Sequence, residues 1–230
     1  MSGGELGFDL PGAGRVLFTD RSHGNLSSVG GVGAQLGEAA RESLRGRIGV
    51  GALARGYQVH GTRVRRLIEI DPVAAAVARP HADEADGQAT SLEAVGTMVL
   101  TADCLPVAVG SRGAVAMLHA GWRGLAGGIL EEGIAAVRDL GREDRLVAVV
   151  GPGAGVCCYE VGEDVHEEFG GAHRHGTHID LRAIAGERLL ASGVAEVLHA
   201  PACTICDERF FSHRREGRLA GRQAGVAWLS

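Results

Sequence analysis

A cysteine and two histidines carry the clearest chemical signal in this chain. Cys104 lies in the segment TADC, His119 opens the segment HAGWRG fifteen residues later, and His60 lies upstream in YQVHG. A thiolate and two imidazoles bind soft or borderline divalent metals such as Zn²⁺. Three protein ligands leave the fourth tetrahedral position open, which is typical of a catalytic rather than a structural zinc. Because the gaps are wide, the fold must bring the three side chains together.

The same three side chains allow two other interpretations. A Cys nucleophile with a His base needs the same atoms and no metal. Cysteine is also among the residue types most often buried, so two ordinary histidines and a buried thiol remain an alternative on pattern alone. Asp103, next to the thiol, is a candidate acceptor for a hydrogen bond from a ligand histidine.

Four further polar residues are candidates for binding a substrate or phosphate. Arg21 and Asn25 lie in the loop after the first predicted strand and could hold a phosphate or a sugar hydroxyl, although Asn25 could equally serve only to turn the backbone. Arg123 follows His119 at the start of a predicted helix, whose free N–H groups and dipole favour an anion. Glu160, in GPGAGVCCYEVG, is a candidate general acid or base.

The predicted elements place the metal-binding candidates at the ends of strands. Residues 97–109 form a continuous apolar stretch that breaks around Cys104, which predicts two strands with the thiol between them. Residues 114–120 predict a buried strand, and 122–141 show the apolar spacing of a helix that ends at a glycine. His119 is therefore expected where a strand ends and a helix begins. The C-terminal segment is expected to form a hairpin.

The other four cysteines form two local pairs. Cys157 and Cys158 are adjacent, and Cys203 and Cys206 have C-x-x-C spacing. A zinc ribbon would need a second C-x-x-C pair, which is absent, and a thioredoxin motif would open a helix after an early strand. Both pairs are therefore predicted to be structural.

Composition excludes several classes of function. The chain has 230 residues and no lysine, which excludes lysine Schiff-base chemistry, pyridoxal phosphate attachment and a P-loop. Its formal net charge of −5 argues against nucleic acid as a partner. No apolar run approaches the ~18 residues that span a membrane, and the N-terminus does not resemble a signal peptide. We therefore expect a cytoplasmic protein with neither a membrane nor a nucleic-acid partner.

Taken together, the motifs resemble the YfiH-like family from about Arg15 to the C-terminus. This family has long been labelled polyphenol oxidase or laccase domain; it is also described as purine nucleoside phosphorylase and adenosine deaminase, and as peptidoglycan editing factor. The resemblance is carried by FTDR, YQVHG, ADGQAT, TADCLPV, HAGWRGLAGGILE, GPGAGVCCYEVG, IDLR, CT and FFSHRREG, in the family's order. The family usually has a longer loop before its early Asn, whereas RSHGNLSS is short here. This difference bears on which residues would bind the sugar or the phosphate.

The resemblance implies a fold, a cofactor and an activity. The fold would be α+β: one domain over residues 1–230, with layered mixed β-sheets flanked by helices in an α/β/β/α order. The cofactor would be zinc, held by His60, Cys104 and His119, which match the family's ligands one for one. The activity would be phosphorolysis of adenosine, inosine and S-methyl-5′-thioadenosine, together with deamination of adenosine. The partners would then be a purine nucleoside and phosphate, and the protein is expected to be a monomer.

Three other functions stay open. A copper polyphenol oxidase could place one Cu²⁺ on the same three ligands, yet a laccase needs several coppers and many H-x-H pairs, of which His173 and His175 form the only example. A metal-free Cys/His hydrolase could act on peptidoglycan precursors. A binding module without activity is the third, and a dense Cys/His pocket argues against it.

Overall fold

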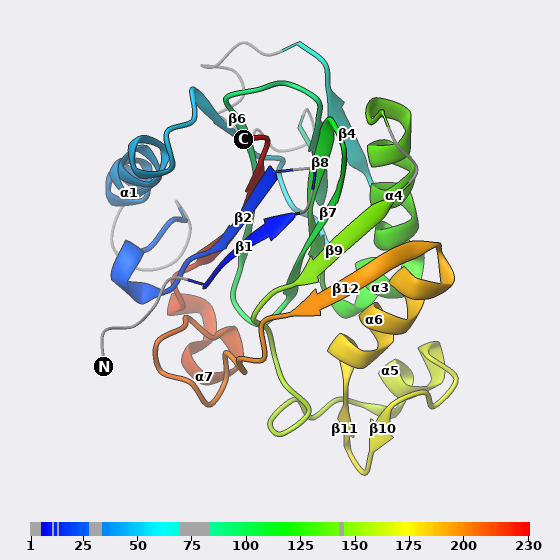
Figure 1. Cartoon of the computed structure of the whole chain (residues 1–230). Helices are drawn as coiled ribbons and strands as arrows, with labels where there is room; N and C mark the ends of the chain where they lie inside the picture. The colour runs from blue at the N-terminus through cyan, green and yellow to red at the C-terminus, as the bar shows by residue number, and fades with distance from the viewer. Residues whose placement is uncertain (1–5, 11, 13, 28–33, 70–82, 143–144) are drawn as a thin grey trace.

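Two mixed β-sheets pack face to face, and helices cover the outer face of each sheet (Figure 1). The computed structural model describes residues 6–10, 12, 14–27, 34–69, 83–142 and 145–230. The layers follow the order helix, sheet, sheet, helix. The α+β class with layered mixed sheets, predicted from the sequence, is confirmed.

The smaller sheet has five strands in the order β1-β2-β13-β6-β3. Neighbouring strands are antiparallel except for β3, which runs parallel to β6. The strands are β1 (Leu6–Leu10), β2 (Gly14–Phe18), β13 (Gln223–Trp228), β6 (Val95–Thr101) and β3 (Ala52–Ala54).

The larger sheet has six strands in the order β12-β9-β7-β8-β5-β4. Its outer pairs, β12 with β9 and β4 with β5, are parallel, and the inner pairs are antiparallel. The strands are β12 (Val194–His199), β9 (Leu146–Val150), β7 (Leu105–Ser111), β8 (Ala114–Ala120), β5 (Gly87–Thr90) and β4 (Val64–Leu67).

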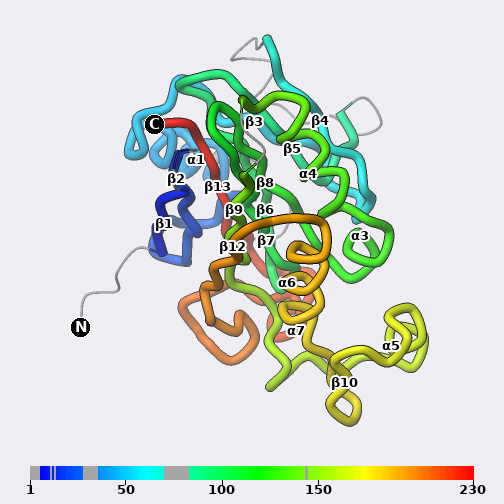
Figure 2. Tube along the Cα trace, turned by 45° about the vertical axis from the view of Figure 1, so that its right-hand side comes forward, coloured from blue at the N-terminus to red at the C-terminus, as the bar shows by residue number. Residues whose placement is uncertain are grey.

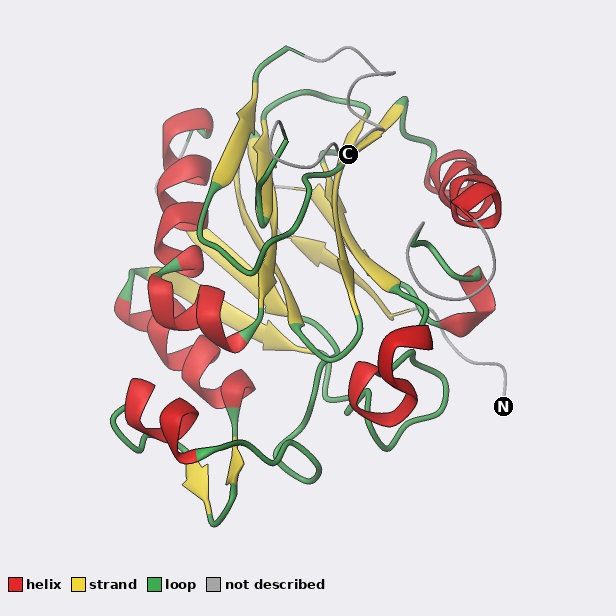
Figure 3. Ribbon diagram, turned by 180° about the vertical axis from the view of Figure 1, so that it is seen from behind, coloured by secondary structure: helices red, strands yellow, loops and turns green. Residues whose placement is uncertain are grey.

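The helices lie outside the two sheets (Figure 3). Helix α1 covers the smaller sheet, whereas α3, α4 and α6 cover the larger one. Helix α5 and the short β10–β11 hairpin extend from the body of the molecule (Figure 2). Their bounds are α1 (Ala34–Ile48), α3 (Trp122–Gly127), α4 (Ile129–Leu140), α5 (Glu163–Glu168), α6 (Leu181–Ala191), α7 (His213–Glu216), β10 (Arg174–His175) and β11 (His178–Ile179), with 3₁₀ turns at Arg21–His23 and Gly217–Leu219.

The central hairpin β7–β8 is buried on both faces. Along β8, Val115 and Met117 face the smaller sheet, whereas Ala116 and Leu118 face the helices. Because side chains alternate between the two faces of a strand, a strand covered on both sides must be apolar at every position. This explains the continuous apolar runs seen in the sequence.

The predicted break at Cys104 is also the point where the chain changes sheets. Strand β6 belongs to the smaller sheet and β7 to the larger one, so residues 102–104 cross between them. Asp103 takes a positive φ of 89° in this crossing. The thiol is therefore carried by a short, sharply turned connection between the two layers.

Two local expectations differ from the structure. The C-terminal segment does not form a hairpin, because its last strand, β13, inserts between β2 and β6. The single helix expected over 122–141 is two helices, since Gly128 adopts a left-handed φ of 102° and separates α3 from α4. Long-range strand pairing caused the first difference, and glycine's access to the left-handed region caused the second.

Candidate metal and catalytic site

The structure gathers His60, Cys104 and His119 at one end of the larger sheet. His60 lies in the connection between β3 and β4, Cys104 in the crossing before β7, and His119 near the end of β8. One ligand atom from each residue lies within 4.8 Å of the others. The two imidazole rings meet edge to face, with centroids 4.9 Å apart. We call these three residues the His-Cys-His site.

Asp86 lies behind this site and is fully buried. Its Oδ1 is 2.7 Å from His119 Nδ1, and its two carboxylate oxygens accept the backbone N–H groups of Val59, His60 and Gly61. One carboxylate therefore orients both histidines: it holds the proton on His119 Nδ1, which leaves Nε2 free as a ligand. It also supports the turn in which His60 takes a positive φ of 61°.

The sequence indicated Asp103, next to the thiol, as the acceptor of a hydrogen bond from a ligand histidine. In the structure the Asp103 carboxylate has other partners. Its carboxylate accepts hydrogen bonds from Thr204 Oγ1 and from the backbone N–H of Arg214, at 2.8 and 2.7 Å. Asp86 lies in the motif ADGQAT, just before β5, and β5 pairs with β8. Only that pairing brings the carboxylate beside His119, 33 residues along the chain.

The electrostatics of the site favour a thiolate. Burial would raise the pKa of Cys104, but the His119 charge and hydrogen bonds from His119 and His60 outweigh it and lower this pKa to about 6. Burial likewise opposes the charged form of His119, yet the Cys104 thiolate and Asp86 raise its pKa to about 9. The pKa of Asp86 is lowered, since the hydrogen bonds it accepts overcome its desolvation. Without a metal, the pair is therefore a thiolate beside an imidazolium at neutral pH.

The arrangement of the donor atoms suits a zinc ion. Ligand atoms around tetrahedral zinc are about 3.3–3.8 Å apart, so three donors already within 4.8 Å need only a small adjustment. Gly121 keeps room for it, because a Cβ there would lie 2.9 Å from Cys104 Sγ and 3.1 Å from His60 Cδ2. One thiolate and two imidazoles, one of them fixed by a carboxylate, are donors that zinc favours.

An arginine and a tyrosine interact with the thiol at longer range, and two further arginines interact with the tyrosine. Arg222 and Tyr159 interact electrostatically with Cys104, and Arg123 and Arg214 with Tyr159. Burial and the Cys104 charge raise the pKa of Tyr159 to about 12, so its hydroxyl is protonated at neutral pH. Sequence reasoning missed Tyr159, Arg214 and Arg222, although CCYEVG, FFSHRREG and the following GR contain them.

Arg21 and Asn25 are engaged in holding the chain together. Arg21 forms an ion pair with Glu216 and donates from Nε to Phe210 O at 3.0 Å. Asn25 Oδ1 accepts the backbone N–H groups of Ser27 and Arg222, at 3.0 and 2.9 Å. Asn25 thus supports a local turn at Ser27, and it also fixes the backbone of Arg222 near the thiol.

Arg123 and Glu160 occupy different surroundings. The Arg123 guanidinium lies 4.1 Å from the centre of the Trp122 ring, on α3. Glu160 is exposed and forms a β-bridge with His178 through its backbone. Within the part of the chain that the structure describes, no hydrogen bond or ion pair joins the Glu160 carboxylate to the His-Cys-His site.

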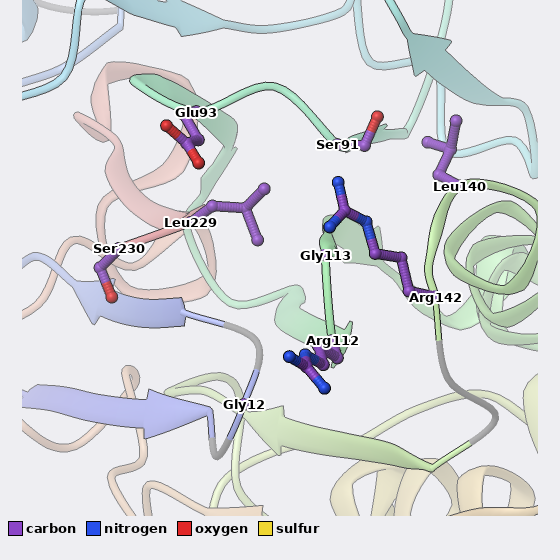
Figure 4. A pocket seen from close by; sticks show the side chains of 9 residues that line it. All are labelled: Gly12, Ser91, Glu93, Arg112, Gly113, Leu140, Arg142, Leu229 and Ser230. Atoms are coloured by element: carbon purple, nitrogen blue, oxygen red, sulfur yellow. The ribbon is translucent and has the colours of Figure 1, made fainter.

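A separate pocket of about 420 Å³ opens at the far end of the β7–β8 hairpin (Figure 4). Arg112, Arg142 and Glu93 line it beside the hairpin turn at Gly113. His119 lies at the opposite end of β8, about 20 Å away at the rise per residue of a strand. The pocket is therefore distinct from the His-Cys-His site, whose donors and carboxylate make it the better candidate for chemistry.

Comparisons with known proteins find relatives in both sequence and fold. The family described as "Multi-copper polyphenol oxidoreductase laccase" matches residues 21–230. A purine nucleoside phosphorylase of Xylella fastidiosa (strain Temecula1) is 37% identical over 238 residues, which covers 96% of this chain and 89% of that protein. The adenosine deaminase RL5, from an unknown prokaryotic organism, is 34% identical and covers 80% of this chain and 78% of its own. The crystal structure of Neisseria meningitidis NMB0706 superposes with a TM-score of 0.82 at 30% identity, covering 98% of this chain and 99% of that one.

Across the described residues, no helix combines the length and the apolar character needed to cross a membrane.

Proposed function

The chain belongs to the YfiH-like family described as multi-copper polyphenol oxidoreductase laccase, and on this premise we propose that it is a zinc-dependent purine nucleoside enzyme. It would cleave adenosine, inosine and S-methyl-5′-thioadenosine with phosphate and would deaminate adenosine. The observation that carries the proposal is the convergence of His60, Cys104 and His119, within 4.8 Å, on one side of the buried Asp86 carboxylate. The names of the relatives from Xylella and of RL5 supply the substrate class.

The three residues of the His-Cys-His site would hold the zinc. Once bound, the ion would lower the pKa of a water and stabilise developing negative charge as a Lewis acid. Asp86 would keep His119 in the ligand tautomer and fix the turn at His60. These are positioning roles, since Asp86 is buried behind the histidines.

The arginines near the thiol would bind phosphate. Arg123, Arg214 and Arg222 bring positive charge around Cys104 and Tyr159, and guanidinium groups bind phosphate through paired hydrogen bonds. A phosphate held there would be positioned to attack the ribose C1′, where positive charge develops during cleavage. Helix α3 has only six residues before the break at Gly128, so we assign no anion site to its N-terminus.

Tyr159 would donate a hydrogen bond to the purine. Its raised pKa keeps the hydroxyl protonated at neutral pH, so it acts as a donor that retains its proton. We place Tyr159 ahead of Glu160 in this role, because Glu160 is exposed and its carboxylate forms no hydrogen bond or ion pair with the site among the described residues.

The experiment is product analysis of the zinc-loaded protein with adenosine, with and without phosphate. Phosphate-dependent adenine, and inosine in either condition, are expected from the wild type and not from Cys104→Ala. Arg142→Ala, in the distant pocket, is the matched control and should form the same products as the wild type. Absence of turnover in both conditions would overturn the proposal.

A metal-free hydrolase is the second candidate, and a specific observation favours it. The lowered pKa of Cys104 and the raised pKa of His119 are those of a thiolate–imidazolium pair, which is how Cys nucleophiles are activated. Such an enzyme, acting on peptidoglycan precursors, would keep its activity in a strong chelator and lose it in Cys104→Ser. The zinc enzyme would lose activity in both.

A further inference from the structure

Four cysteines that are far apart in the sequence meet outside the His-Cys-His site. Cys157 and Cys158 lie in the turn that follows β9, and Cys203 and Cys206 lie in the turn that follows β12. Strands β9 and β12 are parallel neighbours, with Val150 opposite His199. Because parallel strands end at the same edge of a sheet, the two turns emerge side by side (Figure 1).

Backbone hydrogen bonds join these two turns to each other. Gly153 and Cys203 form a β-bridge, and the N–H of Thr204 donates to Gly153 O at 3.0 Å. The N–H of Gly155 donates to Cys203 Sγ at 3.2 Å. The cysteines are thus held by the fold, and their proximity does not depend on side-chain rotamers alone.

The sulfur atoms have the spacing of a metal tetrathiolate. All four Sγ atoms lie within 4.8 Å of one another, and those of Cys157 and Cys206 are 3.8 Å apart. Zinc–sulfur bonds of about 2.3 Å in a tetrahedron separate the sulfurs by about 3.8 Å. All four cysteines are free thiols here, and a disulfide bond would need about 2.05 Å.

The surroundings of Cys203 supply hydrogen bonds and positive charge that suit a metal-bound thiolate. Backbone N–H groups of Ile205 and Cys206 also donate to Cys203, so this sulfur accepts three such bonds with that from Gly155. The partly buried guanidinium of Arg182 interacts electrostatically with Cys203 and Cys157. Arg182 Nη2 donates to Ala202 O at 2.8 Å, whereas its Nε has no hydrogen-bond partner in the described part of the chain. A zinc tetrathiolate carries a net charge of −2, which this arginine would partly balance.

We propose that Cys157, Cys158, Cys203 and Cys206 bind a second zinc ion, in a closed structural site of four thiolates. Binding releases the four thiol protons, and the four sulfurs fill the tetrahedral coordination, so no position stays open for substrate. Soft thiolate ligands in a tetrahedral arrangement select zinc over hard cations.

The second zinc would position residues of the first site. Tyr159 directly follows Cys158 and interacts electrostatically with Cys104. Thr204 lies between Cys203 and Cys206 and donates to Asp103 Oδ1 at 2.8 Å, next to the catalytic candidate Cys104. The N–H of Ala154 donates to Asp103 O at 2.7 Å, also from the first turn. By tying the two turns together, the metal would hold Tyr159 and the sheet crossing at Asp103 in place.

The decisive measurement is the metal content and the sulfur coordination of the full chain, purified under reducing conditions without chelator. The wild type is expected to hold two zinc ions. The double variant His60→Ala/Cys104→Ala should keep one, and X-ray absorption should show four sulfurs around it at about 2.3 Å. Cys104→Ser removes only the fifth cysteine, so it is the matched control and should retain this same four-sulfur zinc.

The outcomes separate this proposal from the function proposed above. If the His-Cys-His site binds no zinc, the wild type holds one ion, still surrounded by four sulfurs, and the tetrathiolate stands. If His60→Ala/Cys104→Ala holds no zinc and all four thiols alkylate freely, the tetrathiolate is overturned. A disulfide found by mass spectrometry after alkylation without reduction, or a shell with fewer than four sulfurs, overturns it as well.

A second variant removes ligands of the proposed tetrathiolate and leaves the His-Cys-His site intact. Cys203→Ser/Cys206→Ser is expected to lose one zinc per chain. Its cobalt-substituted form should lose the intense charge-transfer absorption of a cobalt tetrathiolate, which His60→Ala/Cys104→Ala should keep. Because the latter variant leaves the four cysteines intact, the test stands even where the serine variant fails to fold.

Discussion

The two clusters of metal-binding side chains in this protein are built from different parts of the fold. The His-Cys-His site combines two imidazoles and one thiol, lies at one end of the larger sheet and has the buried Asp86 carboxylate behind it. The four-cysteine cluster lies on two neighbouring turns at one edge of the larger sheet, and its sulfurs are supported by backbone N–H groups and Arg182. Three ligands leave a position for a reactant, whereas four do not. The number and type of ligands are the basis on which we propose chemistry at one site and structural support at the other.

The largest effect is expected from removing the thiol of the first site. Cys104→Ala should lower kcat/KM for adenosine phosphorolysis by about 10³-fold or more, since removal of a single preorganised electrostatic group already costs about 10²–10³-fold. Steady-state kinetics with product analysis would measure it. The variant should still hold the four-sulfur zinc. Activity within tenfold of the wild type would place the chemistry elsewhere.

Removing the second site should affect stability most. Cys203→Ser/Cys206→Ser should lose the stabilisation given by a metal present at 100–1,000 times its Kd, about 3–4 kcal/mol. For a chain of this size that corresponds to a fall in Tm of roughly 5–15 °C. Differential scanning calorimetry would record it, with Cys104→Ser as the cysteine-loss control. An equal Tm for the two variants would contradict a structural role for the four-cysteine cluster.

The pH dependence of thiol reactivity compares the two clusters directly in zinc-free protein. The pKa of Cys104 is lowered to about 6, mainly by His119 acting against burial, whereas burial and neighbouring thiols raise the pKa of Cys157. A lowered pKa places the thiolate at lower pH, so Cys104 should alkylate with a rate that rises through about pH 6. At pH 7 its thiolate fraction exceeds that of an ordinary thiol by roughly 30-fold.

Alkylation with iodoacetamide, followed residue by residue by mass spectrometry, would give the alkylation rates of Cys104 and Cys157 as a function of pH. His119→Gln should move the Cys104 profile to higher pH, because it removes the imidazolium that stabilises the thiolate. Identical profiles for Cys104 and Cys157 would contradict the electrostatics of the first site.

Asp86→Asn should weaken zinc binding at the His-Cys-His site alone. Loss of a carboxylate that orients a ligand histidine costs about 10–100-fold in metal affinity or activity. Competition with a chromophoric chelator would measure the affinity, and the tetrathiolate zinc serves as the internal control, since Asp86 does not contact it. A fall in the affinity of both sites would indicate a general loss of structure.

The smallest effect is expected in the pocket at the other end of β7–β8. Arg142 is exposed, and surface substitutions usually change stability by less than about 0.5 kcal/mol. Arg142→Ala should therefore leave kcat/KM, zinc content and Tm close to those of the wild type. A large loss of activity would assign the pocket a part in the reaction.

Several features of this protein were readable from local patterns. The apolar run of 97–109 with its interruption predicted β6, β7 and the thiol between them, and the change of period after His119 predicted the start of a helix. Burial on one or both faces leaves a repeating pattern along the chain itself. The residue types of His60, Cys104 and His119 indicated a candidate ligand set, but they left a Cys/His hydrolase and an ordinary buried thiol open as alternatives.

The partners of these residues depended on contacts between segments far apart in the chain. Asp86 reaches His119 only because β5 pairs with β8, and the C-x-x-C pair meets Cys157 and Cys158 only because β12 lies parallel to β9. Strand β13 entered the middle of the smaller sheet instead of forming a hairpin for a similar reason. Strand order and register are set by the packing of the whole core, and a local pattern carries no information about which strand will lie beside which.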